Sequence, residues 1–349
     1  MKRYLILEDG TVFEGKAFGA DKTAVGELVF TTGMCGYIET LTDESYFGQI
    51  VLQTFPLIGN YGIIEEDFEG DCSVKAYAVQ EVCDNPSNFR MQKTLDAFLK
   101  EKGIPGICGI DTRAVTKRIR EKGVMNAAVA DEVPDSLDFI KNYKIVKAVE
   151  SVTVKEPRVY NENGKYSVVL IDYGAKRNII RELVKRDCRV TLVPASASAE
   201  EILSLKPGGI MLSNGPGDPA ENVYEINEIK KLAGNVPIFG ICLGHQLLAI
   251  SLGARTEKLK YGHRGVNQPV KETDGKRTYI TSQNHGYAVV SDSIKSGKIS
   301  FINANDGTCE GIAYPEINAF SVQFHPEACS GPRDTAFLFD RFIGLMEEK

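Results

Sequence analysis

Cys242 stands between two glycines, Gly240 and Gly244, in the pattern G-x-C-x-G. The short apolar run at 237–241 predicts a buried strand before the cysteine, and residues 243–252 predict a helix after it. This is the cysteine form of the nucleophile elbow, in which small flanking residues permit a sharp turn. The N–H groups and the positive dipole end of the helix favour the thiolate, which is the reactive form of cysteine. The pattern predicts a nucleophilic Cys242, and a buried structural cysteine is the alternative.

A nucleophilic cysteine needs a base and a group that orients the base. His325 follows an alternating segment at 320–324, so we expect it at the end of a strand. Pro326 restricts the backbone after it, and Glu327 lies two residues on, on the same side of an extended segment. A carboxylate there accepts the Nδ1–H of the imidazole and fixes its tautomer. The alternative is a surface His-Pro-Glu turn.

The other three histidines are weaker candidates for the base. His245 comes three residues after the cysteine, where we expect packing or a role at the helix start. His285 lies in a polar stretch expected to be a loop that positions substrate, and His263 is expected in another loop. We therefore assign the base to His325.

An attacked carbonyl also needs N–H donors for its oxyanion. The N–H of Leu243, directly after the nucleophile, is one candidate. Gly215 offers the second, because it lies in a small-residue loop at 214–219 that follows a predicted strand. The alternative is that 214–219 is only a tight loop rich in glycine and proline.

Bulk properties are those of an ordinary globular protein. The 349 residues are 43% hydrophobic and 25% charged, which predicts about two domains. A net charge of −6 argues against a nucleic-acid partner, and no apolar run is long enough to span a membrane. The N-terminus does not have the pattern of a secretory signal. The eight cysteines include no C-x-x-C pair, so we expect no metal site, free thiols and a cytoplasmic location.

The elements that must hold these residues begin at about residue 166. Predicted strands at 167–171, 189–193, 209–212 and 237–241 alternate with predicted helices. Such alternation predicts an α/β domain, 166–349, with a doubly wound and mostly parallel sheet. Its site is expected at the carboxyl ends of the strands, where Cys242 lies.

The first half has a different pattern. Residues 1–130 predict a separate strand-rich α/β domain that opens with a hairpin, strands 4–8 and 11–13 around a two-residue turn. Helices are predicted at 89–102 and 112–122, and 131–165 reads as a connector. No G-x-x-x-x-G-K-[ST] loop occurs here, so we expect no nucleotide site.

Several motifs resemble a known family. Three of them are similar to those of the class I (triad) glutamine amidotransferases: 214–219, 240–246 and 325–327. Four more resemble the small subunit of carbamoyl phosphate synthetase: 41–46, 58–62, 109–113 and 172–176. The resemblance covers nearly the whole chain.

The resemblance implies that Cys242 attacks the side-chain amide of L-glutamine and forms a thioester. His325 then transfers protons, Glu327 orients it, and the Gly215 and Leu243 N–H groups bind the oxyanion. The remaining glutamine-binding residues that it implies are Ser45, Gly217, Gln246, Asn284, Gly286 and Tyr287. Tyr287 replaces a more usual phenylalanine, which matters only if the ring contacts substrate.

The resemblance also implies a large-subunit partner. That partner uses ATP, Mg and bicarbonate to make carbamoyl phosphate for arginine and pyrimidine synthesis, and no cofactor is expected in this chain. The missing phosphate loop agrees with a synthase on a separate chain, for which residues 1–130 provide a docking surface.

Two other functions stay open. A stand-alone cysteine hydrolase of γ-glutamyl compounds explains the triad but leaves the first 130 residues without a task. A non-catalytic scaffold is disfavoured by the complete set of Cys242, His325 and Glu327.

Overall fold

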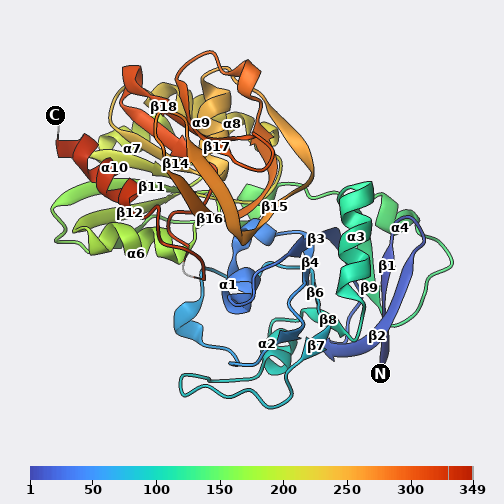
Figure 1. Ribbon diagram of the computed structural model, residues 1–349. Coiled ribbons are helices and arrows are strands. Elements are labelled where there is room, and N and C mark those ends of the chain that lie inside the picture. Colours follow the sequence, from blue (N-terminus) through green and yellow to red (C-terminus); the bar gives the residue numbers. More distant parts are fainter. Residues whose placement is uncertain (329, 348–349) are drawn as a thin grey trace. The chain divides into compact units, whose positions relative to one another are not determined.

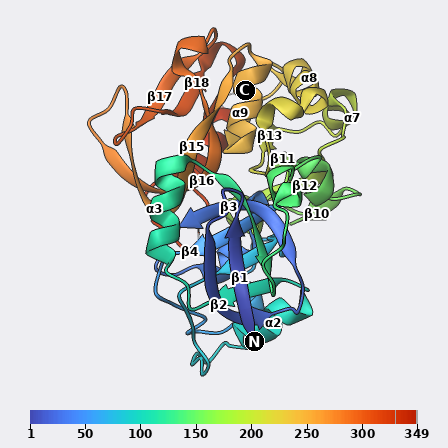
Figure 2. The same ribbon diagram turned by 90° about the vertical axis from the view of Figure 1, so that its right-hand side faces the viewer.

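The computed structural model describes residues 1–328 and 330–347. Its contacts divide the chain into two units, Met1–Ala148 and Val149–Lys349 (Figures 1 and 2). The division falls inside the expected connector, 131–165. That segment holds the helices α4 (Asp138–Lys141) and α5 (Ala148–Val152) and the strand β10 (Arg158–Tyr160).

The first unit is built around a closed barrel with the strand order β1-β2-β8-β6-β4-β3-β9. These strands are β1 (Lys2–Leu7), β2 (Val12–Gly19), β3 (Ala24–Thr31), β4 (Gln49–Gln53), β6 (Ala76–Ala78), β8 (Pro105–Cys108) and β9 (Met125–Ala130). A separate pair joins β5 (Leu57–Ile58) to β7 (Glu81–Val82). The helices of the unit before α4 are α1 (Tyr37–Thr42), α2 (Leu95–Glu101) and α3 (Thr112–Lys122).

The predicted hairpin at the start of the barrel exists, but the two-residue turn is wrong. The Leu7 N–H donates to the carbonyl of Thr11 at 2.9 Å, and Gly10 donates back to Leu7. The Asp9 carboxylate accepts the Thr11 N–H at 3.0 Å. This Asx contact makes a longer loop more stable than the two-residue turn.

The two predicted helices differ in outcome. The prediction for α3 is confirmed at both ends, with Asp111 capping the Ala114 N–H and Gly123 following. The helix expected from residue 89 instead begins at Leu95, because the Thr94 side chain caps it by accepting from the Ala97 N–H.

The second unit contains one ten-stranded sheet, ordered β10-β12-β11-β13-β14-β19-β18-β17-β15-β16. Its further strands are β11 (Tyr166–Asp172), β12 (Cys188–Pro194), β13 (Gly209–Leu212), β14 (Ile238–Ile241), β15 (Thr256–Glu272), β16 (Thr278–Val289), β17 (Lys298–Asn303), β18 (Cys309–Tyr314) and β19 (Ala319–Val322). Its helices after α5 are α6 (Arg177–Lys185), α7 (Ala199–Ser204), α8 (Val223–Leu232), α9 (Leu243–Ser251) and α10 (Phe337–Glu347).

This sheet is mixed, so the prediction of a mostly parallel sheet is wrong. Only the run β12-β11-β13-β14-β19 is parallel. The segment between α9 and β19 contains no α-helix that could serve as a crossover, and its strands pair antiparallel. Local pattern predicted no elements in most of this segment, which contributes four of the ten strands of the sheet, β15 to β18.

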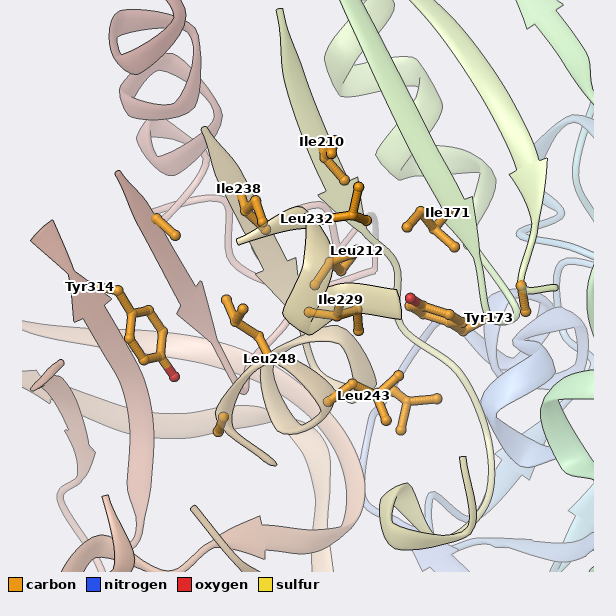
Figure 3. Close-up of a cluster of buried hydrophobic side chains, with 14 of the residues drawn as sticks. Ile171, Tyr173, Ile210, Leu212, Ile229, Leu232, Ile238, Leu243, Leu248 and Tyr314 are labelled. Carbon is orange, nitrogen blue, oxygen red and sulfur yellow. The ribbon is translucent and has the colours of Figure 1, made fainter. Parts of the chain in front are cut away.

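Both faces of the parallel part are covered, as the α/β prediction requires. Alternate residues of β11 divide between two cores: Val169 and Ile171 in one, Val168 and Leu170 in the other. The first core receives side chains from α7, α8 and α9, and Figure 3 shows Ile171 close to Leu212 and Leu232. The second receives side chains from α6 and α10. Together the two layers hold the end of β14 in place.

Two expectations from composition can be compared with the described residues. All seven cysteines among them are free thiols, and Cys329 lies outside the described part of the chain. Within residues 1–328 and 330–347, no helix has the length and apolar character that a membrane crossing requires.

Phe239 is the side chain through which β14 is anchored to the second core. Its ring stacks on Phe320 at 4.3 Å between centroids and meets Phe339 edge-on at 5.7 Å. We expect Phe239→Ala to lower the free energy of unfolding by about 3–5 kcal/mol, because it leaves a cavity in a close-packed layer. Urea unfolding followed by circular dichroism measures this. Val223→Ala, at a 62% exposed site, is the control and should change it by less than about 0.5 kcal/mol.

Candidate active site

Cys242 occupies the junction between β14 and α9, as the elbow pattern predicts. Its backbone has φ 52° and ψ −102°, a strained conformation for a residue with a side chain. A Cβ on Gly244 would lie 2.4 Å from the Leu212 carbonyl oxygen, and one on Gly240 would lie 2.8 Å from that of Gly244. Both glycines are therefore required by close packing. The thiol itself is buried and donates to the Asn284 carbonyl oxygen at 3.7 Å.

His325 comes to the cysteine through strand pairing. β14 and β19 are parallel neighbours with Ile241 opposite Val322, and the Cys242 N–H donates to the Val322 carbonyl at 2.9 Å. The next turn of chain after β19 carries His325, whose N–H is held by the Ser282 carbonyl at 3.0 Å. Consequently the two side chains lie at the carboxyl ends of adjacent strands.

The imidazole of His325 is oriented by Glu327. Its Nδ1 lies 2.7 Å from Glu327 Oε1, and both side chains are almost completely buried. A carboxylate only accepts, so Nδ1 carries the proton and Nε2 is the ring atom available to Cys242. This is the relation of base and orienting carboxylate that a catalytic triad needs.

Lys176 is a third charged group beside this pair. Its Nζ lies 3.4 Å from His325 Nδ1 and 3.9 Å from Glu327 Oε1. Burial and the Lys176 charge lower the pKa of His325, but Glu327 and Cys242 raise it more, to about 9. Burial raises the pKa of Glu327, whereas His325 and Lys176 lower it, with a net fall. The buried group is thus a charged imidazolium–carboxylate pair at neutral pH.

Lys176 lies in the motif at 172–176, whose pattern predicted no role for the lysine. The lysine is placed by Asn214, whose Oδ1 accepts the Lys176 N–H and whose Nδ2 donates to Gly174, both at 3.0 Å. Its position just after a predicted strand was the feature of the sequence that could have marked Lys176 as a site residue.

Gly215, one of the two expected oxyanion donors, packs against the side chain of Leu243, the other. A Cβ on Gly215 would lie 2.2 Å from the Tyr173 carbonyl oxygen and 2.8 Å from the Leu243 side chain. Leu243 is the first residue of α9, so its N–H has no carbonyl partner within the helix. Gly217, in the same loop as Gly215, has φ +92°, which favours glycine.

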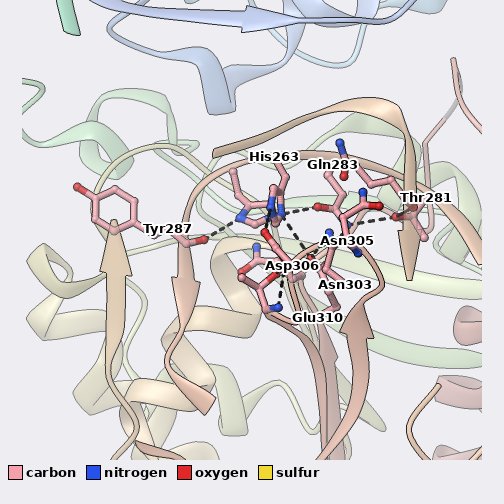
Figure 4. A network of polar contacts seen from close by, with 12 residues as sticks. His263, Thr281, Gln283, Tyr287, Asn303, Asn305, Asp306 and Glu310 are labelled. Carbon is pink, nitrogen blue, oxygen red and sulfur yellow. Dashed lines mark hydrogen bonds and ion pairs between the residues drawn. The ribbon is translucent and has the colours of Figure 1, made fainter. Parts of the chain in front are cut away.

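The remaining residues expected to bind glutamine form a connected group within the second unit. Gln246 Nε2 donates to the Tyr287 carbonyl at 2.7 Å and to Gln323 Oε1 at 2.8 Å, so the amide nitrogen is already engaged. Asn284, Gly286 and Tyr287 all lie on β16. Tyr287 meets Gln246 through its backbone, and its ring points away from the polar network in Figure 4. The ring therefore takes no part in this contact.

Ser45 is the one expected site residue in the first unit. It lies in a 3₁₀ turn, Glu44–Tyr46, where the Asp43 carboxylate accepts its N–H at 3.0 Å.

The other three histidines lie in regular structure. His245 is fully buried in α9, bonds Ser321 Oγ at 2.8 Å, and burial lowers its pKa to about 3, which confirms a packing role. The loops expected for His263 and His285 are wrong: the two residues lie opposite one another on the strands β15 and β16. Figure 4 shows His263 in a polar network, and the His285 ring lies edge-on to the His263 ring at 4.9 Å between centroids.

Comparison with known proteins agrees with this geometry. The profile of the class-I glutamine amidotransferases matches residues 169–345, and that of the carbamoyl-phosphate synthase small chain, CPSase domain, matches residues 5–129. The carbamoyl phosphate synthase small chain of Oceanobacillus iheyensis is 51% identical over 99% of this chain and 96% of its own length. That of Listeria monocytogenes is 50% identical over 100% of this chain and 98% of its own. The chain therefore belongs to the family of carbamoyl phosphate synthase small chains, and its second unit is a class-I glutamine amidotransferase.

Proposed function

We propose that Cys242, His325 and Glu327 are the catalytic triad of this chain, which is the glutaminase subunit of carbamoyl phosphate synthase. The observation that carries the assignment is the buried contact of 2.7 Å between His325 Nδ1 and Glu327, which leaves Nε2 for the cysteine on the adjacent strand end. The strained backbone of Cys242 supports it further, because such conformations persist mainly where function requires them.

The reaction begins with the thiolate of Cys242 and the imidazolium of His325. The sulfur attacks the amide carbon of the glutamine side chain, and the carbonyl oxygen becomes an oxyanion that accepts from the N–H groups of Leu243 and Gly215. The intermediate collapses by breaking the C–N bond. His325 gives its proton to the departing nitrogen, so ammonia leaves and a thioester remains.

Hydrolysis of the thioester regenerates the site. Neutral His325 takes a proton from water as the water attacks the thioester carbonyl, and the same N–H groups bind the second oxyanion. The C–S bond then breaks, which releases glutamate and restores the thiolate–imidazolium pair. Glu327 keeps the imidazole in one tautomer and stabilises its charge throughout.

The other residues proposed to hold glutamine fall into two groups within the second unit, with one residue more from the first unit. Gly217 belongs to the loop after β13, whereas Gln246 and the β16 residues are linked by the bond from Gln246 to the Tyr287 carbonyl. The Asn284 carbonyl, in contact with the sulfur, makes β16 a wall of the site. Ser45 is proposed as the contribution of the first unit. These residues are Ser45, Gly217, Gln246, Asn284, Gly286 and Tyr287.

A small chain implies a large-chain partner. We propose that the ammonia passes to that partner in the cytoplasm, that the partner uses ATP, Mg and bicarbonate, and that the carbamoyl phosphate serves arginine and pyrimidine synthesis. The barrel unit, which matches the CPSase domain of small chains, is proposed as the docking surface.

The triad assignment predicts a separation of two reactions in the complex with a large chain. Cys242→Ser should lower glutamine-driven carbamoyl phosphate synthesis by about a thousandfold or more, because the nucleophile is lost. The ammonia-driven reaction should be unchanged, because it bypasses this site. Both rates are measured as carbamoyl phosphate formed.

Cys188→Ser is the matched control, since Cys188 is a buried thiol outside the triad, and it should keep both reactions. Survival of the glutamine-driven reaction in Cys242→Ser would contradict the assignment. Glutamine hydrolysis by a wild-type chain that binds no large chain would favour a stand-alone hydrolase.

The charges around His325 predict opposite pH shifts for two variants. Glu327 raises the pKa of His325 and Lys176 lowers it, with a net value of about 9. The active imidazolium is lost as the pH rises through this pKa. Glu327→Gln should move the alkaline limb of the kcat/KM profile to lower pH and reduce kcat on the order of 10²-fold. Lys176→Met should move that limb to higher pH, and shifts of the same sign would refute this account.

A further inference from the structure

A second cluster of polar side chains lies outside the triad, where β15, β16 and β18 carry His263, His285 and Glu310. Figure 4 shows His263 and Glu310 in this cluster. One ligand atom from each of these side chains lies within 4.8 Å of the other two. His263 Nδ1 is 3.5 Å from Glu310 Oε1, close to the edge of about 3.4 Å in a tetrahedron of 2.0–2.1 Å bonds. The Glu310 side chain is completely buried, and that of His263 is 11% exposed. Three side chains of types that bind zinc, two imidazoles and a carboxylate, therefore converge.

Each imidazole is held at its other nitrogen by an acceptor. His263 Nε2 lies 2.7 Å from Asp306 Oδ2, and His285 Nδ1 lies 2.7 Å from the Tyr287 carbonyl oxygen. Since a carboxylate or carbonyl oxygen can only accept, each of these nitrogens carries the proton. The second nitrogen of each ring then presents a lone pair. This is the arrangement in which a carboxylate or backbone carbonyl orients a metal-binding histidine.

The position of Gln283 creates a conflict that protein groups alone do not resolve. With Nδ1 as donor, the lone pair of His285 Nε2 faces Gln283 Oε1 at 3.1 Å. In the structure, Gln283 Nε2 donates to Glu310 Oε2 at 3.0 Å. Reversing the Gln283 amide corrects the contact with His285, but it replaces this donor with an oxygen that faces Glu310 Oε2. Either orientation leaves two acceptors facing one another, so the network needs a cation or one more proton.

A divalent ion balances the charges of Glu310 and Asp306 and uses both imidazoles in their neutral form. A proton closes the network instead if it sits on Glu310, where it would donate to the Gln283 oxygen after the amide is reversed. Asn303 and Gln283 already hold the Glu310 carboxylate in place, at 3.2 and 3.0 Å.

We propose that His263, His285 and Glu310 form a binding site for a divalent metal ion of the zinc class. Two imidazoles and one carboxylate suit zinc better than magnesium or calcium, which prefer oxygen ligands alone. The Gln283 oxygen is close enough to His285 to serve as a fourth ligand. The ion ties three antiparallel strands together beside Asn284 and Tyr287, and so stiffens that wall of the glutaminase site without entering the chemistry.

The test is zinc binding by the full-length chain carrying Cys242→Ser, which removes the catalytic thiol as a competing ligand. The chain is stripped with a chelator, equilibrated with micromolar Zn²⁺, desalted, and analysed for metal by mass spectrometry. We expect about one zinc per chain. Glu310→Gln, which keeps the side-chain shape, should abolish this binding, and Asp306→Asn should weaken it about 10–100-fold. Glu257→Gln, an exposed site on β15, is the matched control and should retain the zinc.

Co²⁺ added to the Cys242→Ser chain gives an independent readout that does not depend on the folding of Glu310→Gln. The visible absorption of four-coordinate Co²⁺ with nitrogen and oxygen ligands, displaced by Zn²⁺, would support the site. Less than a tenth of an equivalent of zinc together with no such spectrum would overturn the proposal and leave a proton as the closing element of the network. Zinc bound equally by the Cys242→Ser chain with and without Glu310→Gln would also overturn it.

Discussion

The parallel pairing of β14 with β19 is the constraint on which the glutaminase site depends. It sets Ile241 opposite Val322 and lets the Cys242 N–H bond the Val322 carbonyl, so Cys242 and His325, the proposed nucleophile and base, leave the sheet side by side. The turn at Cys242 is possible only because Gly240 and Gly244 leave room for the backbone. Close packing, rather than any single hydrogen bond, holds the cysteine in its strained conformation, since two cores fix β14 from opposite faces.

Within this frame the site is a buried set of charges. Lys176, His325 and Glu327 lie within 4 Å of one another at their nearest atoms; His325 and Glu327 are buried, and Lys176 is mostly covered. Removing charges from water is costly unless they are paired and hydrogen-bonded. The Asn214 side chain orders the loop that carries Lys176, so the loops after β11 and β13 and the turn after β19 depend on each other. A preorganised group of this kind has little to rearrange during the reaction.

The antiparallel strands β15 to β18 give the proposed site its second wall. β16 carries Asn284 against the sulfur and Tyr287 against Gln246, while β15 and β18 stand behind it with His263 and Glu310. Isolated antiparallel ribbons are flexible, and register shifts interrupt the β15–β16 pairing on both sides of His263. A network of buried polar side chains between these strands is a means of fixing their register.

The sequence by itself determined those features that depend on local residue patterns and on side-chain chemistry. Neighbouring residues alone set the elbow spacing, the alternation of strands and helices after residue 166, and the capped helix α3. They also singled out Cys242, His325 and Glu327 as candidates. Tertiary structure decided the rest. Pairings between distant segments form the hairpins between α9 and β19 and place His263 and His285 on strands. Contact between distant segments also brings Lys176 to His325. Periodicity within one segment carries no information on its distant partner, because register and packing are set by the partner as much as by the segment.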